Sequence, residues 1–198
     1  PNGDFSDLLE KVAQVKGIKR IRYTSPHPQD FDDKLLNIMS KYDNICNHIH
    51  LPLQAGSDTV LKRMNRTYTK KEFISLVKKI RHVLPDCSIS TDIIVGFPGE
   101  EESDFHETLE MMKINKFNFA YMFKYSSRPG TKASEYDNQI DEKIKQERLE
   151  KLIKTQLEIT LLQNKKKIGS IEYVLIEKES KKSSDFWSGR TDGNTWTI

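Results

Sequence analysis

STDIIVGFPGE, residues 90–100, is the stretch of sequence that decides the fold. Its apolar run, Ile93 to Val95, ends in a turn rich in glycine and proline, which is typical of a buried strand. A helix is predicted next, because Phe105, Leu109 and Met112 recur on one face after an acidic first turn. Ligands of parallel α/β folds bind where a strand meets such a loop. A plain tight connection is the alternative interpretation of the glycine turn.

Strands and helices alternate on both sides of this stretch. Strands are predicted at residues 18–23, 47–53, 88–95 and 117–125. Helices are predicted at residues 5–16, after Asp30, after Ser57, after the capping box of Thr69 and Glu72, and at 141–163. The alternation predicts parallel βα units over residues 1–163, as an open sheet or as part of a barrel.

The composition changes after this region. Short strands are predicted at 172–177 and 186–190, with turn residues between them. We therefore expect residues 164–198 to begin a small antiparallel β-barrel that is truncated here.

The chain has 198 residues, of which 36% are hydrophobic and 31% charged, and a formal net charge of +3. This length fits one ordinary domain and part of a second. Only Cys46 and Cys87 occur, so neither a disulfide framework nor a CxxC metal site is predicted, and a reducing, cytoplasmic location is the simplest inference. No apolar run approaches the length of a membrane span.

Because residue 1 is proline and a helical pattern follows almost at once, we expect a fragment of a longer protein.

Histidines on the second predicted strand suggest one kind of site. Cys46, His48 and His50 are spaced two apart, so their side chains share a face. A metal-dependent barrel hydrolase could use such a pair, with His27 and Asp92 recruited as further ligands. Histidines that simply pack on a strand are the alternative.

Polar residues at the predicted strand ends form a second candidate set. They are Thr24, Ser25, Gln54, Asp92, Gly96, Glu100, Lys124, Tyr125 and Ser126. Hydroxyl, amide and carboxylate groups gathered at one edge would suit a ribose, an amino group and an adenine. Ordinary βα loops also favour serine, threonine and aspartate, which is the alternative.

The tail combines cations with aromatic rings. Lys178, Lys181, Lys182 and Arg190 lie near Phe186 and Trp187 in the sequence. Cations for phosphates and rings for base stacking predict an RNA-binding surface. A solvated charged edge is the alternative interpretation of this surface. For the chain as a whole, a non-catalytic RNA-binding module is an alternative to an enzyme.

Four segments together resemble a known family, the radical-SAM methylthiotransferases. They are HIHLPLQAGSDTVLKRMNR (48–66), ISTDIIVGFPGE (89–100), FKYSSRPGTKA (123–133) and SDFWSGRTDGN (184–194). The resemblance covers essentially the whole chain and is greatest for the branch that adds a methylthio group to N6-isopentenyladenosine beside the tRNA anticodon. Sister branches modify threonylcarbamoyladenosine in tRNA or a ribosomal protein.

The resemblance implies the C-terminal part of a radical-SAM partial (β/α) barrel, followed by an RNA-binding TRAM domain. It implies S-adenosylmethionine as cofactor, two [4Fe-4S] clusters in the full-length protein, and a tRNA anticodon stem-loop as partner. Neither set of cluster cysteines occurs here, so the fragment itself is expected to hold no cluster and to be inactive. The implied cofactor-binding residues are Ser25, Gln54, Asp92, Gly96, Glu100 and Tyr125, and the implied RNA-binding residues are Arg128, Lys178, Lys181, Lys182 and Arg190.

Overall fold

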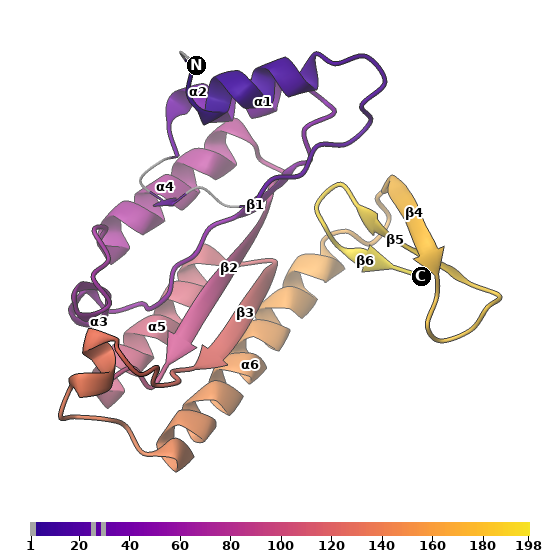
Figure 1. Ribbon diagram of the computed structural model, residues 1–198. Helices are drawn as coiled ribbons and strands as arrows, with labels where there is room; N and C mark the ends of the chain where they lie inside the picture. Colours follow the sequence, from indigo (N-terminus) through magenta and orange to yellow (C-terminus); the bar gives the residue numbers. More distant parts are fainter. Residues whose placement is uncertain (1–2, 25–26, 29–30) are drawn as a thin grey trace.

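A computed structural model describes residues 3–24, 27–28 and 31–198 (Figure 1). Its α-helices are α1 Phe5–Ala13, α2 Asp33–Lys41, α3 Asp58–Arg63, α4 Lys70–Val83, α5 Glu102–Asn115 and α6 Glu142–Lys165, and a short 3-10 helix, η2, spans Lys132–Glu135. Its strands are β1 His48–His50, β2 Ser88–Val95, β3 Phe119–Lys124, β4 Val174–Glu179, β5 Trp187–Thr191 and β6 Trp196–Thr197. Two of the sequence predictions, Ser25 as a ligand and Asp30 as a helix cap, lie outside the described residues.

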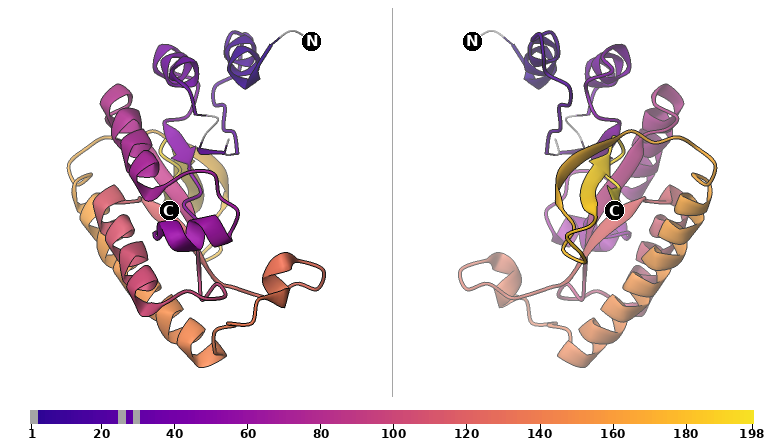
Figure 2. Two further views of the ribbon diagram at one scale, coloured as in Figure 1. Left: turned by 90° about the vertical axis from the view of Figure 1, so that its left-hand side faces the viewer. Right: turned by 90° about the vertical axis from the view of Figure 1, so that its right-hand side faces the viewer.

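The centre of the fold is a parallel sheet in the order β1-β2-β3. β2 has the bounds that the sequence predicted, and its register pairs Ile49 with Ile89 on one side and Ile94 with Phe123 on the other. Helices α4, α5 and α6 cover one face of this sheet (Figures 1 and 2). The predicted mixed α/β fold with parallel strands is therefore confirmed.

Of the first two predicted strands, one is absent and the other is shorter than expected. The prediction of a strand at 18–23 was wrong: only Ile21 forms a parallel bridge there, to Ile45. The segment 47–53 retains only β1, because Pro52 has no N–H to donate and Gln54 takes a positive φ of 67°. Gln54 then rejoins the sheet through a bridge to Ile93.

Helix starts follow the local capping signals closely. The predicted capping box of α4 is present, with Thr69 accepting from the Glu72 N–H and Glu72 accepting in return. The N-cap of α2 is Asp32, not the predicted Asp30, and its carboxylate accepts from the Leu35 N–H.

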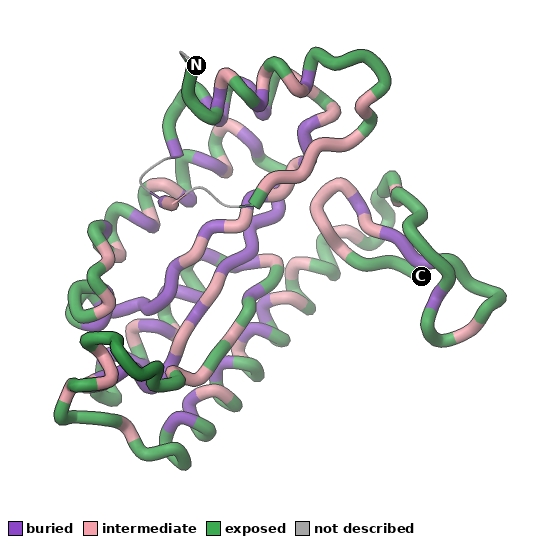
Figure 3. The backbone as a smooth tube through the Cα atoms, in the orientation of Figure 1, coloured by how far each residue is buried: buried purple, intermediate pink, exposed green. Residues whose placement is uncertain are grey.

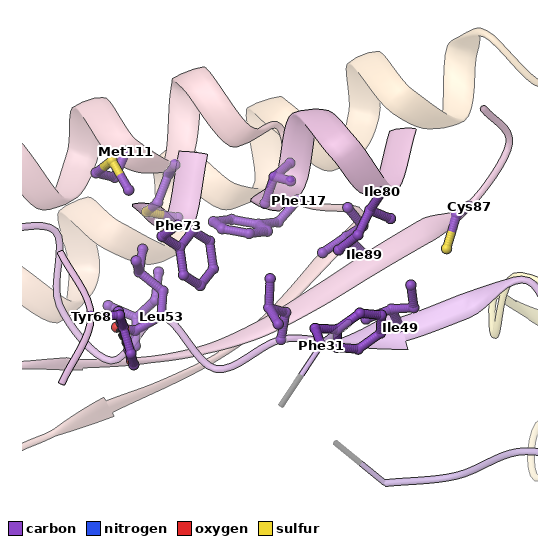
Figure 4. Packing of buried hydrophobic residues seen from close by; sticks show 14 of the residues in the cluster. Phe31, Ile49, Leu53, Tyr68, Phe73, Ile80, Cys87, Ile89, Met111 and Phe117 are labelled. Carbon is purple, nitrogen blue, oxygen red and sulfur yellow. Dashed lines mark hydrogen bonds between the residues drawn. The ribbon is translucent and has the colours of Figure 1, made fainter. Parts of the chain in front are cut away.

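The core lies between the sheet and its helices (Figures 3 and 4). Ile49 of β1, Ile89 of β2 and Ile80 of α4 are fully buried in it. The rings of Phe73 and Phe117 meet edge to face, with centroids 6.1 Å apart. Burying such side chains contributes about 1.5–3 kcal/mol each, so this layer fixes the strand positions on which the site depends.

The tail forms a separate antiparallel sheet in the order β4-β5-β6 beside the amino ends of the parallel strands (Figure 1). The first two strands begin within two residues of the predicted positions. Arg20 and Arg22 attach this sheet by donating to the main-chain carbonyls of Tyr173, Arg190, Thr191 and Asp192. A small antiparallel sheet is thus confirmed, while the closed TRAM barrel stays a prediction.

Among the described residues, no helix combines the length and apolar character that crossing a membrane requires.

Candidate functional site

A cleft of about 910 Å³ opens at the carboxyl edge of the parallel sheet. Its walls come from the ends of β2 and β3, the segment after β1 that includes α3, and the loop that carries η2. The lining residues are Gln54, Lys62, Arg63, Met64, Asn65, Arg66, Ile94, Phe97, Phe123, Lys124, Tyr125, Ser126, Arg128, Thr131, Lys132, Ala133 and Tyr136. This is the edge at which parallel α/β folds bind their ligands.

The charged side chains that line the cleft are all positive. Six of its described lining residues are lysine or arginine, and none is aspartate or glutamate. Aromatic side chains share the lining, and the rings of Phe97 and Tyr125 meet edge to face with centroids 5.0 Å apart. Cations beside aromatic rings suit a ligand that has both anionic groups and flat rings.

Two of the six cations are held by the protein itself. Arg63 donates to the carbonyls of Pro98 and Gly99, and Lys124 pairs with Glu142 at 3.4 Å. The side chains of the other four, Lys62, Arg66, Arg128 and Lys132, make no hydrogen bond or ion pair with any described residue. These four are available to a ligand.

Two buried polar atoms in the cleft wall lack partners. Arg66 Nε and Tyr125 Oη are both shielded from solvent, and neither has a hydrogen-bond partner among the described residues. Buried polar groups are normally satisfied, because each unpaired one costs about 1–3 kcal/mol. The two atoms therefore mark unsatisfied polar positions in the cleft wall.

Gln54 reaches the cleft through an unusual backbone. Its φ of 67° is in the left-handed region, which is uncommon for a residue other than glycine. Main-chain bonds on both sides hold it there, from its N–H to the Asp92 carbonyl and from the Ile94 N–H to its own carbonyl, each 2.8 Å. Such enforced conformations cluster at functional sites.

Gly96 and Glu100 shape the loop after β2 but lie outside the cleft lining. Gly96 has a φ of 73°, and its N–H donates to Glu100 Oε1 at 2.9 Å. Arg148 of α6 donates to the same oxygen at 2.7 Å. Burial raises the pKa of Glu100, an effect that the Gly96 N–H and Arg148 oppose. The carboxylate that we predicted as a ligand faces inward, where it holds the loop.

Asp92 also lies outside the cleft lining, on the open face of the sheet. Its carboxylate is 3.1 Å from His50 Nε2, while Ser90 Oγ lies 2.8 Å from His50 Nδ1 and 3.0 Å from His48 Nε2. Desolvation, together with nearby Arg22 and His50, lowers the pKa of His48 to about 4. Among the described residues, no group of three or more His, Cys, Asp or Glu side chains is arranged to hold a metal. The hydrolase alternative therefore has no assembled ligand set there.

The predicted RNA-binding residues fall at two separate places. Arg128 lines the cleft. Lys178 and Arg190 lie over the Trp196 ring, at 5.0 and 5.2 Å from its centroid, on the tail sheet beside the other end of the strands. Lys181 and Lys182 are both exposed in the turn after β4. The structure does not bring the tail cations into the cleft.

Sequence reasoning missed several residues of this region. Lys62 and Arg66 belong to the run KRMNR, a basic cluster that follows Gln54 closely enough to have drawn attention. For Lys132 the only signal in the sequence was its place in the segment FKYSSRPGTKA, residues 123–133. Arg148 lies 48 residues from its partner Glu100, and nothing local in the sequence links the two.

Comparison with known proteins identifies the superfamily and the fold of this chain. Residues 1–112 match the radical SAM superfamily. Over 68% of this chain the fold is similar to 31% of coproporphyrinogen III oxidase from Escherichia coli, described as a radical SAM enzyme, with a TM-score of 0.57 and 18% identity. That likeness concerns the fold alone.

Curated relatives carry a more specific name, tRNA-2-methylthio-N(6)-dimethylallyladenosine synthase. Those from Natranaerobius thermophilus and Finegoldia magna are each 46% identical over 96% and 94% of this chain, and that from Pelotomaculum thermopropionicum is 43% identical over 98%. The chain spans 41–44% of the length of these relatives. The family resemblance predicted from the motifs is confirmed.

Proposed function

The chain belongs to the radical SAM superfamily, and from this we propose that it forms part of a tRNA-modifying methylthiotransferase. The proposed product is the 2-methylthio derivative of N6-isopentenyladenosine, next to the anticodon. One observation carries the proposal: a cleft at the carboxyl edge of the sheet combines four cations that lack partners among the described residues with two unsatisfied buried polar atoms. The names of the relatives agree with this choice of substrate.

The residues of the cleft fit S-adenosylmethionine. Arg66, whose buried Nε has no partner among the described residues, would bind the carboxylate of the cofactor. Tyr125 Oη and the Gln54 side chain would bind its hydroxyl or amino groups. Asp92, Gly96 and Glu100 would act behind them, by fixing the loops that carry the lining residues. When bound, S-adenosylmethionine supplies the radical chemistry, and the protein supplies orientation.

The cysteines of this chain do not fit an iron–sulfur cluster. Cys46 and Cys87 are both buried and neither lines the cleft. Burial raises their pKa values to about 11 and about 12, whereas a cluster ligand must be a thiolate. In the proposed full-length enzyme, the cluster ligands therefore come from outside residues 1–198.

The tRNA anticodon stem-loop is the proposed partner of both basic surfaces. Arg128 would contact RNA at the cleft, and Lys178, Lys181, Lys182 and Arg190 would contact it from the tail. We assign residues 1–163 to the barrel and 164–198 to the start of a TRAM domain, on the basis of the change from parallel to antiparallel pairing. A cytoplasmic location follows from a tRNA substrate and agrees with two free cysteines.

The proposal is tested by nucleoside analysis of tRNA. Cells that lack the full gene should lose the 2-methylthio group from modified N6-isopentenyladenosine and should accumulate the unmethylthiolated nucleoside. The intact gene should restore the group, whereas a gene encoding Arg66→Ala should restore much less. If tRNA from the deletion strain keeps its 2-methylthio group, or loses a different modification, the proposed substrate is wrong.

A further inference from the structure

Two lysines of the cleft remain without a role in the proposed cofactor site. Lys62 is on α3 and Lys132 begins η2, and both are exposed. They line the same cleft from different segments, and the loop that carries η2 stands away from the end of the sheet (Figure 2). Neither ammonium group has an ion-pair or hydrogen-bond partner among the described residues.

The charge of the cleft exceeds what the cofactor can neutralise. S-adenosylmethionine has a single carboxylate, against an ammonium and a sulfonium group, so its net charge is positive. Arg66 would satisfy that carboxylate, which leaves Lys62, Arg128 and Lys132 facing a ligand of like charge. Like charges gathered around one small cavity repel unless an anion joins them. The cleft therefore favours a second, anionic ligand over another cationic one.

The aromatic lining narrows the class of that anion. Phe97, Phe123, Tyr125 and Tyr136 line the same space as the cations. Phe97 already meets Tyr125 and Tyr136 edge to face, but Phe123 is 51% exposed. A nucleotide of a polyanionic chain would use this ring and the cations together, whereas a free inorganic anion would use the cations alone. No described lining residue is acidic, so nothing in the cleft repels a phosphate backbone.

We propose that Lys62 and Lys132 form a clamp that binds RNA phosphates on either side of the nucleoside entering the cleft. The clamp rests on the proposed function, because it takes the ligand to be the tRNA substrate of that same site. The clamp assigns a different ligand to each group of cations: Arg66 binds the carboxylate of the cofactor, and the two exposed lysines bind phosphates of the RNA.

The test uses the full-length protein and an RNA anticodon stem-loop, with binding followed by fluorescence anisotropy at several salt concentrations. Lys62→Ala and Lys132→Ala should each weaken RNA binding severalfold. Each should also reduce the slope of log affinity against log salt by about 0.7, the value for one lost phosphate contact on a single strand. Lys62→Arg and Lys132→Arg should keep the wild-type slope and the wild-type affinity for S-adenosylmethionine. The two alanine variants remove a cation that faces the positively charged cofactor, so they should bind it no more weakly than the wild type does.

Lys154→Ala is the matched control, because Lys154 is an exposed lysine of α6 that does not line the cleft. If the slopes for Lys62→Ala and Lys132→Ala equal that of Lys154→Ala, the clamp is wrong. A loss of S-adenosylmethionine affinity instead, or displacement of the RNA by a free nucleoside diphosphate at equal concentration, also overturns it. A protein that shows the lysine dependence yet adds no methylthio group would refute the proposed function and retain the clamp.

Discussion

Two clefts of comparable size lie at opposite ends of the parallel sheet. The cleft at the carboxyl edge measures about 910 Å³ and the cleft at the amino edge about 710 Å³. Among their described lining residues, the first has six cations and no carboxylate. The second has four cations, Arg81, Lys116, Lys166 and Lys167, with three carboxylates, Asp86, Glu172 and Asp192.

The amino-edge cleft nearly balances its own charges, with four cations against three carboxylates among its described lining residues. Lys167 pairs with Glu172 at 2.9 Å, and Arg81 donates to the carbonyls of Asn115 and Lys116. The Asp192 carboxylate accepts from the Asn47 N–H at 2.7 Å, which helps to join the tail to the barrel region. Volume alone would not separate the two clefts. The pairing of their charges does, since only the carboxyl edge leaves most of its cations to a ligand.

The largest expected effect is on the stability of the loop after β2, which carries part of the lining of the carboxyl-edge cleft. Glu100 and Arg148 form a buried pair, with side chains 1% and 7% exposed. Arg148→Ala should lower the free energy of unfolding by about 3–5 kcal/mol, because it leaves a carboxylate buried without its cation. Urea denaturation of the purified protein measures this change.

The controls for Arg148 separate the buried charge from the loss of a side chain. Lys151→Ala removes an exposed lysine that is 3.9 Å from Glu102, and should cost less than about 1 kcal/mol. Adding Glu100→Gln to Arg148→Ala should recover part of the loss, because no unpaired carboxylate then stays buried. A loss below about 1 kcal/mol for Arg148→Ala would mean that the pair does not support the loop.

Next in size is the effect of the unsatisfied arginine in the cleft. Arg66→Ala in the full-length protein should weaken S-adenosylmethionine binding by about tenfold to a hundredfold, because a charged hydrogen bond contributes about 1.5–3 kcal/mol. Isothermal titration calorimetry measures the affinity, with Lys154→Ala, outside the cleft, as the comparison that leaves it unchanged. Equal affinities for the wild type and Arg66→Ala would remove the reason for placing the cofactor carboxylate at this residue.

The third expected effect is on the pH dependence of stability, and it comes from His48 at the start of β1, a histidine that lies near Arg22, Arg190 and Asp192. Burial lowers the pKa of His48 from 6.5 to about 4, with Arg22, His50 and Arg190 adding to the shift and Asp192 opposing it. Below pH 6.5 the unfolded state binds a proton that the folded state rejects, so stability falls as the pH decreases toward 4. His48 alone should remove about 2 kcal/mol between pH 7 and pH 5.

Urea denaturation of the wild type and His48→Gln at both pH values isolates this contribution. Glu100 has a raised pKa and so acts with the opposite sign, but it is common to both proteins and cancels in the comparison. His48→Gln should lose less stability on acidification than the wild type. Parallel pH dependences would show that His48 is protonated as easily in the folded protein as in the unfolded chain.

The sequence predicted those parts of the molecule that local signals determine. β2 ends at its glycine turn, and α4 begins at its capping box, because both signals lie within a few residues. Residues 18–23 failed as a strand because their pairing depends on distant partners: Ile21 bridges to Ile45, and the flanking Arg20 and Arg22 turn to the tail.

The candidate site shows the same limit. Gln54, Tyr125 and Arg128 line the cleft, as their positions at strand ends suggested. Asp92, Gly96 and Glu100 do not. Asp92 shares a face of β2 with the lining residue Ile94 but lies two residues further from the carboxyl end, where its carboxylate faces His50, and the turn after β2 directs Glu100 inward toward Arg148. The spacing of residues identified the edge of the sheet, whereas the pairing of each charge required the packed structure.

The smallest expected effect tests the contrast between the clefts most directly. Lys166 lines the amino-edge cleft and is exposed, as Lys62 is at the carboxyl edge. Because carboxylates share its cleft, a phosphate approaching Lys166 is also repelled, so Lys166→Ala should change RNA affinity by less than about 0.5 kcal/mol and leave the salt slope unaltered. Anisotropy titrations alongside Lys62→Ala provide the measurement. If Lys166→Ala reduces the slope as much as Lys62→Ala does, the RNA phosphates also enter the amino-edge cleft itself, and charge pairing does not distinguish the two clefts.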